Sequence, residues 1–275
     1  MWTQIVGKVR LALAPPINHW WHVPLYVSAR GLTTSAIPYR DAAFEMTFDF
    51  IDHRLVIDTS AGARRTIALT PQTVADFYRR VMETLRELGI EVRIWPMPVE
   101  VPSPIRFEQD TQHRSYDPEA AHRFWRVLQR SDLVLKEFRG RFIGKCSPVH
   151  FFWGSFDMAV SRFNGRRAPD RPGADSITRE AYSHETISAG FWPGVPGKLD
   201  AAFYSYTAPA PEGYKDARVA PAAAYYDGGL NIYILEYEQV RTAASPRDVL
   251  LEFLQSTYDA GADLARWDRG ELERR

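Results

Sequence analysis

The two halves of the chain carry the same short patterns in the same order. A His-aromatic-aromatic triplet at residues 19–21 recurs at residues 150–152, and Ala-Ala-Phe at residues 42–44 recurs at residues 201–203. Each half begins with a short helical segment and a proline-containing bend. Each half ends with an amphipathic helix, which follows Thr-Pro in the first half and Ser-Pro in the second. This order predicts a duplicated chain, with the ordinary redundancy of α+β sequences as the alternative.

Apolar periodicity predicts the elements of both halves. Spacings of three and four residues predict helices at residues 2–13, 71–88, 118–128 and 246–258, with Thr70, Asp117 and Ser245 as N-caps of the last three. Period-two alternation predicts antiparallel strands at residues 44–50, 55–58, 66–69, 201–206 and 230–235. We therefore expect an α+β fold of two pseudo-repeats, each an antiparallel sheet packed by amphipathic helices. The predicted boundaries are residues 1–94 for the first repeat, 95–117 for a proline-rich connector and polar loop, 118–268 for the second repeat with insertions, and 269–275 for a charged tail.

Residues 19–28 are predicted to form a strand that mixes aromatic rings with polar groups. Period two places Trp20, His22 and Tyr26 on one face and apolar residues on the other. The apolar face is expected in the core. The mixed face suits the lining of a cavity as well as a solvated surface.

Residues 145–158 combine a thiol, an imidazole, a carboxylate and four aromatic rings, and are also predicted to form a strand. Alternation places Trp153 and Asp157 on one face and Phe156 on the core face. His150 is in register with the core face. Two mixed faces from corresponding strands would meet across a cleft between the repeats, which is a favoured place for a ligand.

Composition excludes some classes of function. The 34 basic residues balance 34 acidic ones, which argues against binding of a nucleic-acid backbone. Cys146 is the only cysteine, so no intrachain disulfide forms and a reducing compartment is expected. No signal-peptide pattern and no apolar run of roughly 20 residues is found. We expect a cytoplasmic protein with no membrane partner and an oligomeric state that the sequence does not define.

Three stretches resemble the signatures of one family. Residues 21–33, 144–157 and 182–185 are similar to motifs of an uncharacterised bacterial protein family catalogued only as a domain of unknown function. The resemblance covers nearly the whole chain, and the central motif is the most specific of the three. It implies membership of a family but no activity, so function has to be argued from the residues.

A metal site is one candidate. His19 and His22 form H-x-x-H, but on a strand they would point to opposite faces. Asp110 with His113, or histidines brought together by folding, would supply the ligands of a catalytic site. No CxxC or HExxH pattern supports this, so cofactors stay unknown, with a divalent metal as one alternative and satisfied histidines as the other.

Nucleophilic catalysis by Cys146 is a second candidate, with His150 or His184 as base and Asp157 or Glu185 as its orienting group. Cysteine is among the most often buried residue types, which favours a structural role. Lys145 would lower the thiol pKa only if the two side chains converged, and alternation separates them.

We favour proton transfer or hydrolysis on a small molecule without a covalent step, because this hypothesis uses the most observations. The alternative is a non-catalytic small-molecule binding or sensor protein with the same pocket. Core packing is the competing explanation for the aromatic residues. The predicted catalytic residues are His22, Asp110, His113, His150, Asp157, His184 and Glu185, and the predicted ligand-binding residues are Trp20, Tyr26, Arg30, Arg106, Tyr116, Lys145 and Trp153.

Overall fold

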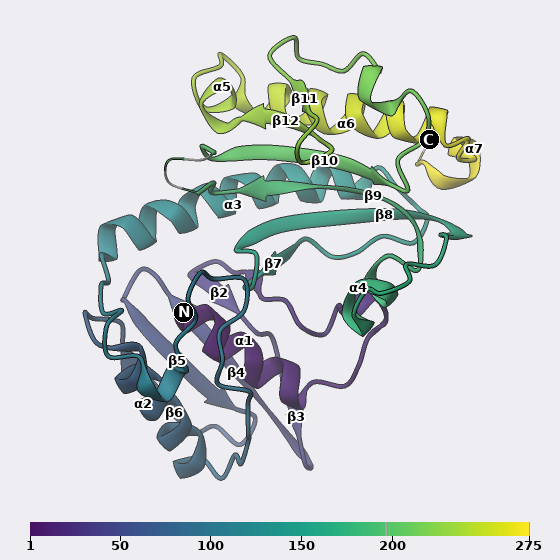
Figure 1. Ribbon diagram of the computed structural model, residues 1–275. Helices are drawn as coiled ribbons and strands as arrows, with labels where there is room; N and C mark the ends of the chain where they lie inside the picture. The colour runs from purple at the N-terminus through teal and green to yellow at the C-terminus, as the bar shows by residue number, and fades with distance from the viewer. Residues whose placement is uncertain (196, 198, 275) are drawn as a thin grey trace. The chain divides into compact units, whose positions relative to one another are not determined.

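The computed structural model describes residues 1–195, 197 and 199–274, and contains two antiparallel sheets with packed helices (Figure 1). The predicted α+β class is therefore confirmed. The chain divides into two compact units. Unit 1 comprises Met1–Ile17, Trp21–Gln129 and Phe151–Ser155, and unit 2 comprises Asn18–Trp20, Arg130–His150 and Phe156–Arg275.

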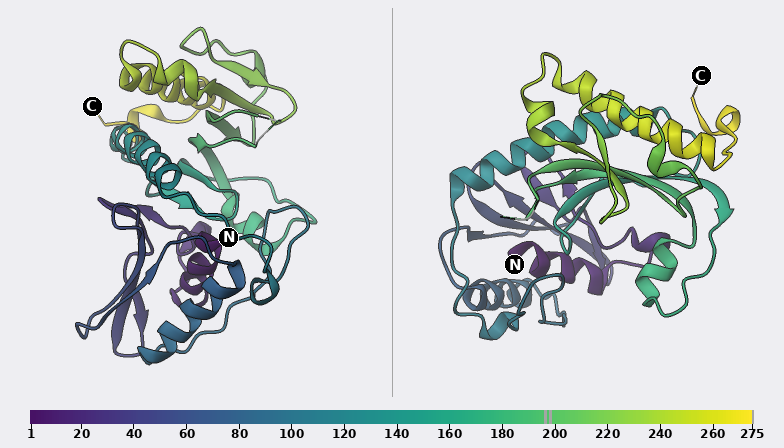
Figure 2. Two further views of the ribbon diagram at one scale, coloured as in Figure 1. Left: turned by 90° about the vertical axis from the view of Figure 1, so that its left-hand side faces the viewer. Right: turned by 45° about the horizontal axis from the view of Figure 1, so that its top comes forward.

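Unit 1 is a strand meander with helices on one face. Its sheet has the order β1-β2-β4-β5-β6, and β3 pairs with β4. Apolar residues alternate into the core along β4, and they meet the buried stripe of α2, so α1 and α2 lie on the same side of the sheet (Figure 2). The elements are α1 (Trp2–Leu13), β1 (Tyr26–Val27), β2 (Gly31–Thr33), β3 (Ile37–Tyr39), β4 (Ala42–Asp49), β5 (Arg54–Thr59), β6 (Arg64–Ala68), α2 (Val74–Glu87) and the 3-10 turn η2 (Phe107–Gln109).

Unit 2 holds the second sheet, with the order β11-β12-β10-β9-β8-β7. The helix α6 packs on one face of this sheet, where an added Cβ at Gly261 would meet Thr207 and Ile187 (Figure 1). The elements are η1 (Asn18–Trp20), α3 (Pro118–Gly140, which begins in unit 1), β7 (His150–Phe152, which ends in unit 1), β8 (Asp157–Arg167), α4 (Ser176–Ala181), β9 (His184–Trp192), β10 (Ala202–Ala208), η3 (Tyr214–Asp216), β11 (Tyr225–Asp227), β12 (Ile232–Glu236), α5 (Tyr237–Arg241), α6 (Pro246–Leu264) and α7 (Arg269–Leu272).

The two sheet-based halves fit the expected pseudo-repeats, since each is a meander packed by amphipathic helices. One pair of matched triplets does not lie at equivalent places in the sheets. Residues 42–44 begin β4, the third strand along its path from β1, whereas residues 202–203 begin β10, the fourth along its path from β7. Duplication of the chain stays a prediction.

The predicted helix starts are partly confirmed. Pro246 is at the first position of α6 after Ser245, as expected, but the Ser245 hydroxyl donates to the Asp248 carboxylate at 2.6 Å instead of capping a backbone N–H. The start of α2 at Thr70-Pro71 is wrong. The helix begins at Val74, because the Thr73 hydroxyl accepts the N–H of Asp76 at 3.0 Å.

The predicted strand over residues 19–28 is wrong. His19 and Trp20 have left-handed backbones, with φ of 56° and 61°, within η1, and only Tyr26–Val27 forms a strand. Pro24 contributes to this outcome, because proline has no N–H to donate to a strand ladder. The single mixed face of Trp20, His22 and Tyr26 therefore does not form.

The predicted strand over residues 145–158 is also wrong at residues 145–149, which precede β7, and in its middle. β7 ends at Phe152, residues 153–156 form a turn, and β8 begins at Asp157. A turn resets the alternation of faces. As a result Trp153 is only 7% exposed, while Phe156, which was expected in the core, is 39% exposed with φ of 61°.

Within the described residues, every helix is too short or too polar to cross a bilayer.

Candidate functional site

The face of the unit 2 sheet opposite α6 is rich in hydroxyl groups. Residues directly opposite one another in antiparallel strands project to the same side. Thr207 and Ile187 face α6, so their chain neighbours Tyr206 and Ser188 face away from it. We call this surface the polar face, and its rows are Ala159, Gly190 and Tyr204, then Ser161, Ser188 and Tyr206, then Phe163, Thr186 and Ala208.

Hydrogen bonds connect the hydroxyls of the polar face and its border. The Tyr204 hydroxyl donates to the carboxylate of Asp157, and the Tyr206 and Tyr182 hydroxyls lie 2.9 Å apart. Burial raises the pKa of both phenols well above the usual value. The second cause is the Asp157 charge for Tyr204 and the Tyr182 hydroxyl for Tyr206. Both therefore stay protonated at neutral pH, and Tyr204 donates its one hydroxyl proton to Asp157.

A small residue makes room for this arrangement. An added Cβ at Gly190 would lie 2.6 Å from the Tyr204 hydroxyl and 2.1 Å from the carbonyl oxygen of Met158. In the next row the Ser161 hydroxyl donates to Ser188 at 2.9 Å. Glycine at position 190 thus lets the Tyr204 ring lie flat against the strand and reach Asp157.

His19 adjoins the polar face at Phe163. Its ring stacks on the Phe163 ring with centroids 4.5 Å apart, and Nδ1 lies 3.0 Å from the carbonyl oxygen of Glu180 and 3.2 Å from that of Ala181. Carbonyl oxygens only accept, so we assign the proton to Nδ1 and leave Nε2 as an acceptor. Lys145 Nζ lies 2.7 Å from Nε2 and donates to it.

His184 completes a cluster of nitrogen bases with His19 and Lys145. The two imidazoles meet edge to face with centroids 5.7 Å apart, and His184 Nδ1 lies 3.0 Å from the Ser183 hydroxyl. Desolvation lowers the pKa of all three groups, and the nearby Lys145 charge lowers the pKa of both histidines further. Each group therefore favours its neutral form more than it does in water, and shifted titrations of this kind are common at functional sites.

The other predicted residues of unit 2 have mainly structural contacts. The Glu185 carboxylate accepts from Arg166 at 2.6 Å and from Asn164 at 2.6 Å. His150 is 1% exposed. Burial raises the pKa of Cys146 to about 11, which keeps the thiol protonated and opposes a role as nucleophile.

The remaining predicted residues lie in unit 1, except Trp20, which belongs to η1 of unit 2. Their meeting with the unit 2 residues in one cleft stays a prediction. Their contacts within unit 1 are Ile17 N to His22 Nδ1 at 3.1 Å, the Arg10 guanidinium over Tyr26 at 5.2 Å, Arg30 to Asp49 at 2.6 Å, Arg106 to Glu108 at 2.7 Å, His113 to Asp110 at 2.8 Å, His53 to Tyr116 at 2.9 Å, and Trp153 Nε1 to the Val23 carbonyl at 2.9 Å.

A metal finds little support in the part of the chain that the structure describes. There, no group of three or more His, Cys, Asp or Glu side chains is arranged to hold an ion. Among these residues, His113 and Asp110 form a pair without a third such ligand.

Sequence reasoning missed Tyr204, Tyr206 and the contacts of His19 with Phe163 and Lys145. The tyrosines had a visible signal, since they alternate with buried residues along residues 202–208. His19 was set aside because a strand was assumed, and nothing local in the sequence indicates its stacking on Phe163.

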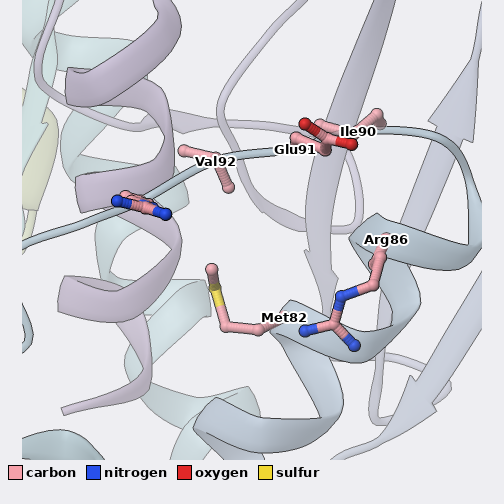
Figure 3. Close-up of a pocket in the computed structure, with 6 residues that line it drawn as sticks. Met82, Arg86, Ile90, Glu91 and Val92 are labelled. Carbon is pink, nitrogen blue, oxygen red and sulfur yellow. The ribbon is translucent and has the colours of Figure 1, made fainter.

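A separate hollow in unit 1 holds none of the predicted site residues. It has a volume of about 530 Å³ and is lined by α2 and the segment that follows it. Figure 3 shows Met82 and Val92 pointing toward one another across it. Its other lining residues are Arg86, Ile90, Glu91 and Arg93.

A family model described as "Family of unknown function (DUF5996)" matches residues 1–274. Neither the curated proteins nor the solved structures contain a match to the chain.

Proposed function

We propose a function from the residues alone, because the chain belongs to DUF5996, a family of unknown function. In this proposal the protein is a small-molecule enzyme with acid-base chemistry of the isomerase or hydrolase type. The polar face of unit 2 binds the substrate, and the cluster of His19, Lys145 and His184 moves the proton. The observation that carries the proposal is the 2.7 Å contact between Lys145 Nζ and His19 Nε2.

The contact supports a defined proton path. Because Nδ1 of His19 donates to two backbone carbonyls, Nε2 is a fixed acceptor for one proton of the Lys145 ammonium. The same carbonyls offset part of the desolvation that disfavours the imidazolium, and the neutral amine of Lys145 then takes a proton from the substrate. The lowered pKa of Lys145 makes this amine accessible nearer to neutral pH.

The polar face supports recognition of an aromatic or oxygen-bearing substrate. The Tyr204 and Tyr206 rings stack with centroids 6.3 Å apart and present ring surface together with hydroxyl groups. The Asp157 carboxylate orients the Tyr204 hydroxyl. A small carbonyl compound with an acidic C–H bond fits a base at its carbon, and the hydroxyl proton that the Tyr182–Tyr206 pair does not use internally donates to its oxygen.

The test uses phenylpyruvate, which has a ring, a carboxylate, a carbonyl and an acidic methylene group. The full-length protein is expected to accelerate exchange of the methylene protons in D₂O, measured by proton NMR. Lys145→Met should abolish the acceleration, since the amine removes the proton. Lys136→Met is the matched control, because the Lys136 ammonium is paired with Asp132 at 2.6 Å on α3.

If Lys145→Met and His19→Gln accelerate exchange as well as the wild type does, the catalytic assignment is rejected. The same holds if the wild type binds phenylpyruvate without accelerating exchange. That result would favour the second candidate, a non-catalytic binding protein. The hydroxyl pairs of the polar face support this candidate, because they preorganise a recognition surface that needs no change in protonation.

A further inference from the structure

A second concave surface lies in unit 1, apart from the polar face. It has a volume of about 550 Å³ and lies where the turn after β4 meets the first turns of α3. We call it the His53 pocket. Its lining residues are Ile51, His53, Pro118, Glu119, His122 and Arg123.

The His53 imidazole is held rigidly at this pocket. The residue has a left-handed backbone with φ of 49°, which is uncommon for a residue other than glycine and is often found at functional sites. Its Nδ1 lies 2.9 Å from the Tyr116 hydroxyl. The Tyr116 ring stacks on Trp2 at 5.3 Å, and Trp2 stacks on Phe77 at 4.5 Å, so a column of rings fixes the imidazole.

Because Tyr116 binds Nδ1 of His53, the other ring nitrogen, Nε2, is available to a ligand in the pocket. Burial raises the pKa of Tyr116 to about 12, so its hydroxyl keeps its proton and can donate to Nδ1. In that arrangement Nε2 carries hydrogen and becomes a donor. Among the described residues, no hydrogen-bond partner contacts His53 Nε2.

His122 and Arg123 add further donors from α3. The His122 ring packs against Trp125 at 5.4 Å, and its nitrogens make no hydrogen bond to the residues that the structure describes. Arg123 has a long contact of 3.5 Å with Glu119, and both side chains are well exposed. Such a pair contributes little, so the guanidinium is available to another carboxylate.

Apart from the exposed Glu119 carboxylate, the rest of the pocket is apolar. Ile51 is 45% exposed there although it is a large aliphatic residue, and Pro118 also lines the surface. A patch that joins aliphatic surface to three nitrogen donors matches a ligand with an anionic head and an apolar tail. A metal fits less well, since no set of three ligating side chains forms among the described residues.

We propose that the His53 pocket binds a small carboxylate with an aliphatic or aromatic tail. The guanidinium of Arg123 and the two imidazoles hold the carboxylate, and Ile51 and Pro118 contact the tail. The site is independent of the proposed enzyme activity, because it lies in unit 1 and shares no residue with the polar face or the base cluster.

The experiment titrates hexanoate into the full-length protein by calorimetry and follows the histidine ring resonances by NMR. Wild-type protein should bind hexanoate saturably and shift the His53 and His122 signals. Arg123→Ala and His122→Ala should each weaken binding by about tenfold, the loss expected for one charge-assisted hydrogen bond. Arg126→Ala is the matched control, since Arg126 is also exposed on α3 and does not line the pocket.

Lys145→Met should bind hexanoate as the wild type does, which separates this site from the enzyme proposal. Binding that is absent in the wild type, or unchanged in Arg123→Ala, His122→Ala and His53→Ala together, overturns the proposal. Inorganic phosphate that displaces hexanoate with equal affinity also overturns it, because the apolar tail would then contribute nothing.

Discussion

The two sheets differ on the faces that their own helices leave uncovered. In unit 1 that face carries Thr47 and Val56 side by side, and its charges are paired, with Arg64 to Asp58 at 2.5 Å and Arg30 to Asp49 at 2.6 Å. In unit 2 the corresponding face carries linked tyrosine and serine hydroxyls and ends at the cluster of His19, Lys145 and His184. Similar meanders thus carry paired charges on this face in one unit and linked hydroxyls with nitrogen bases in the other.

The largest expected effect comes from a substitution at Gly190, which tests how closely the residues of the polar face are packed. Gly190→Ala places a methyl group 2.1 Å from the Met158 carbonyl oxygen and 2.6 Å from the Tyr204 hydroxyl. We expect a loss of about 1–3 kcal/mol in the free energy of unfolding, measured by urea denaturation. Gly228→Ala is the control, because an added Cβ there meets nothing within 4 Å. Equal stability of the two variants would show that the face is loosely packed.

A smaller effect is expected from the hydroxyl network itself. Tyr204→Phe removes the hydrogen bond to Asp157, and we expect a loss of about 1 kcal/mol in the free energy of unfolding by the same method. Tyr225→Phe is the control, since Tyr225 is 41% exposed and its hydroxyl makes no hydrogen bond to a described residue. Loss of stability only in Tyr225→Phe would contradict the contrast between the two faces.

Acid is expected to weaken unit 2 through its histidines. Desolvation lowers the folded-state pKa of His19 and His184 below the ordinary value of 6.5, so below that pH the unfolded state binds more protons. Their contribution to stability is therefore present above pH 6.5 and is lost as the pH falls toward the folded pKa. Lys145 and Arg167 increase the effect, while the Glu180 and Ala181 carbonyls oppose it at His19.

Urea midpoints at about pH 7.5 and about pH 5.5 measure this dependence, since histidine changes its charge between these values. The double variant His19→Gln and His184→Gln should show a smaller difference between the two midpoints than the wild type. An unchanged difference would mean that other groups dominate the acid response.

The smallest effect belongs to unit 1. Arg64→Ala breaks the exposed pair with Asp58, and we expect the thermal midpoint to stay within error of the wild-type value by differential scanning calorimetry, because exposed ion pairs contribute little. A clear drop would indicate that the charged face of unit 1 is also structurally important, which would remove much of the contrast between the sheets.

Apolar periodicity in the sequence was sufficient to predict helices and strands that bury one regular face. The stripe of α2 and the alternation of β4 both match buried faces, so their periodicity was sufficient. The turn at residues 153–156 and the left-handed His19 and Trp20 were not predicted, since each interrupts an alternation that continues in the sequence.

The candidate site depended on contacts between distant residues. Lys145 and His184 were among the predicted site residues, but their meeting with His19 joins segments more than a hundred residues apart. Periodicity carries no information about such contacts. The period-two spacing of Tyr204 and Tyr206, in contrast, was available in the sequence and would have indicated the polar face.

The placement of residues 18–20 has a consequence for how this gene can vary. These three residues belong to unit 2, although the residues before and after them belong to unit 1. Conversely, residues 151–155 belong to unit 1, although the residues before and after them belong to unit 2. A break at residue 130 would separate His19 from Phe163 and Lys145. Recombination that exchanges one half between relatives would therefore pair a foreign histidine with a resident lysine, and we expect the two halves to be inherited together.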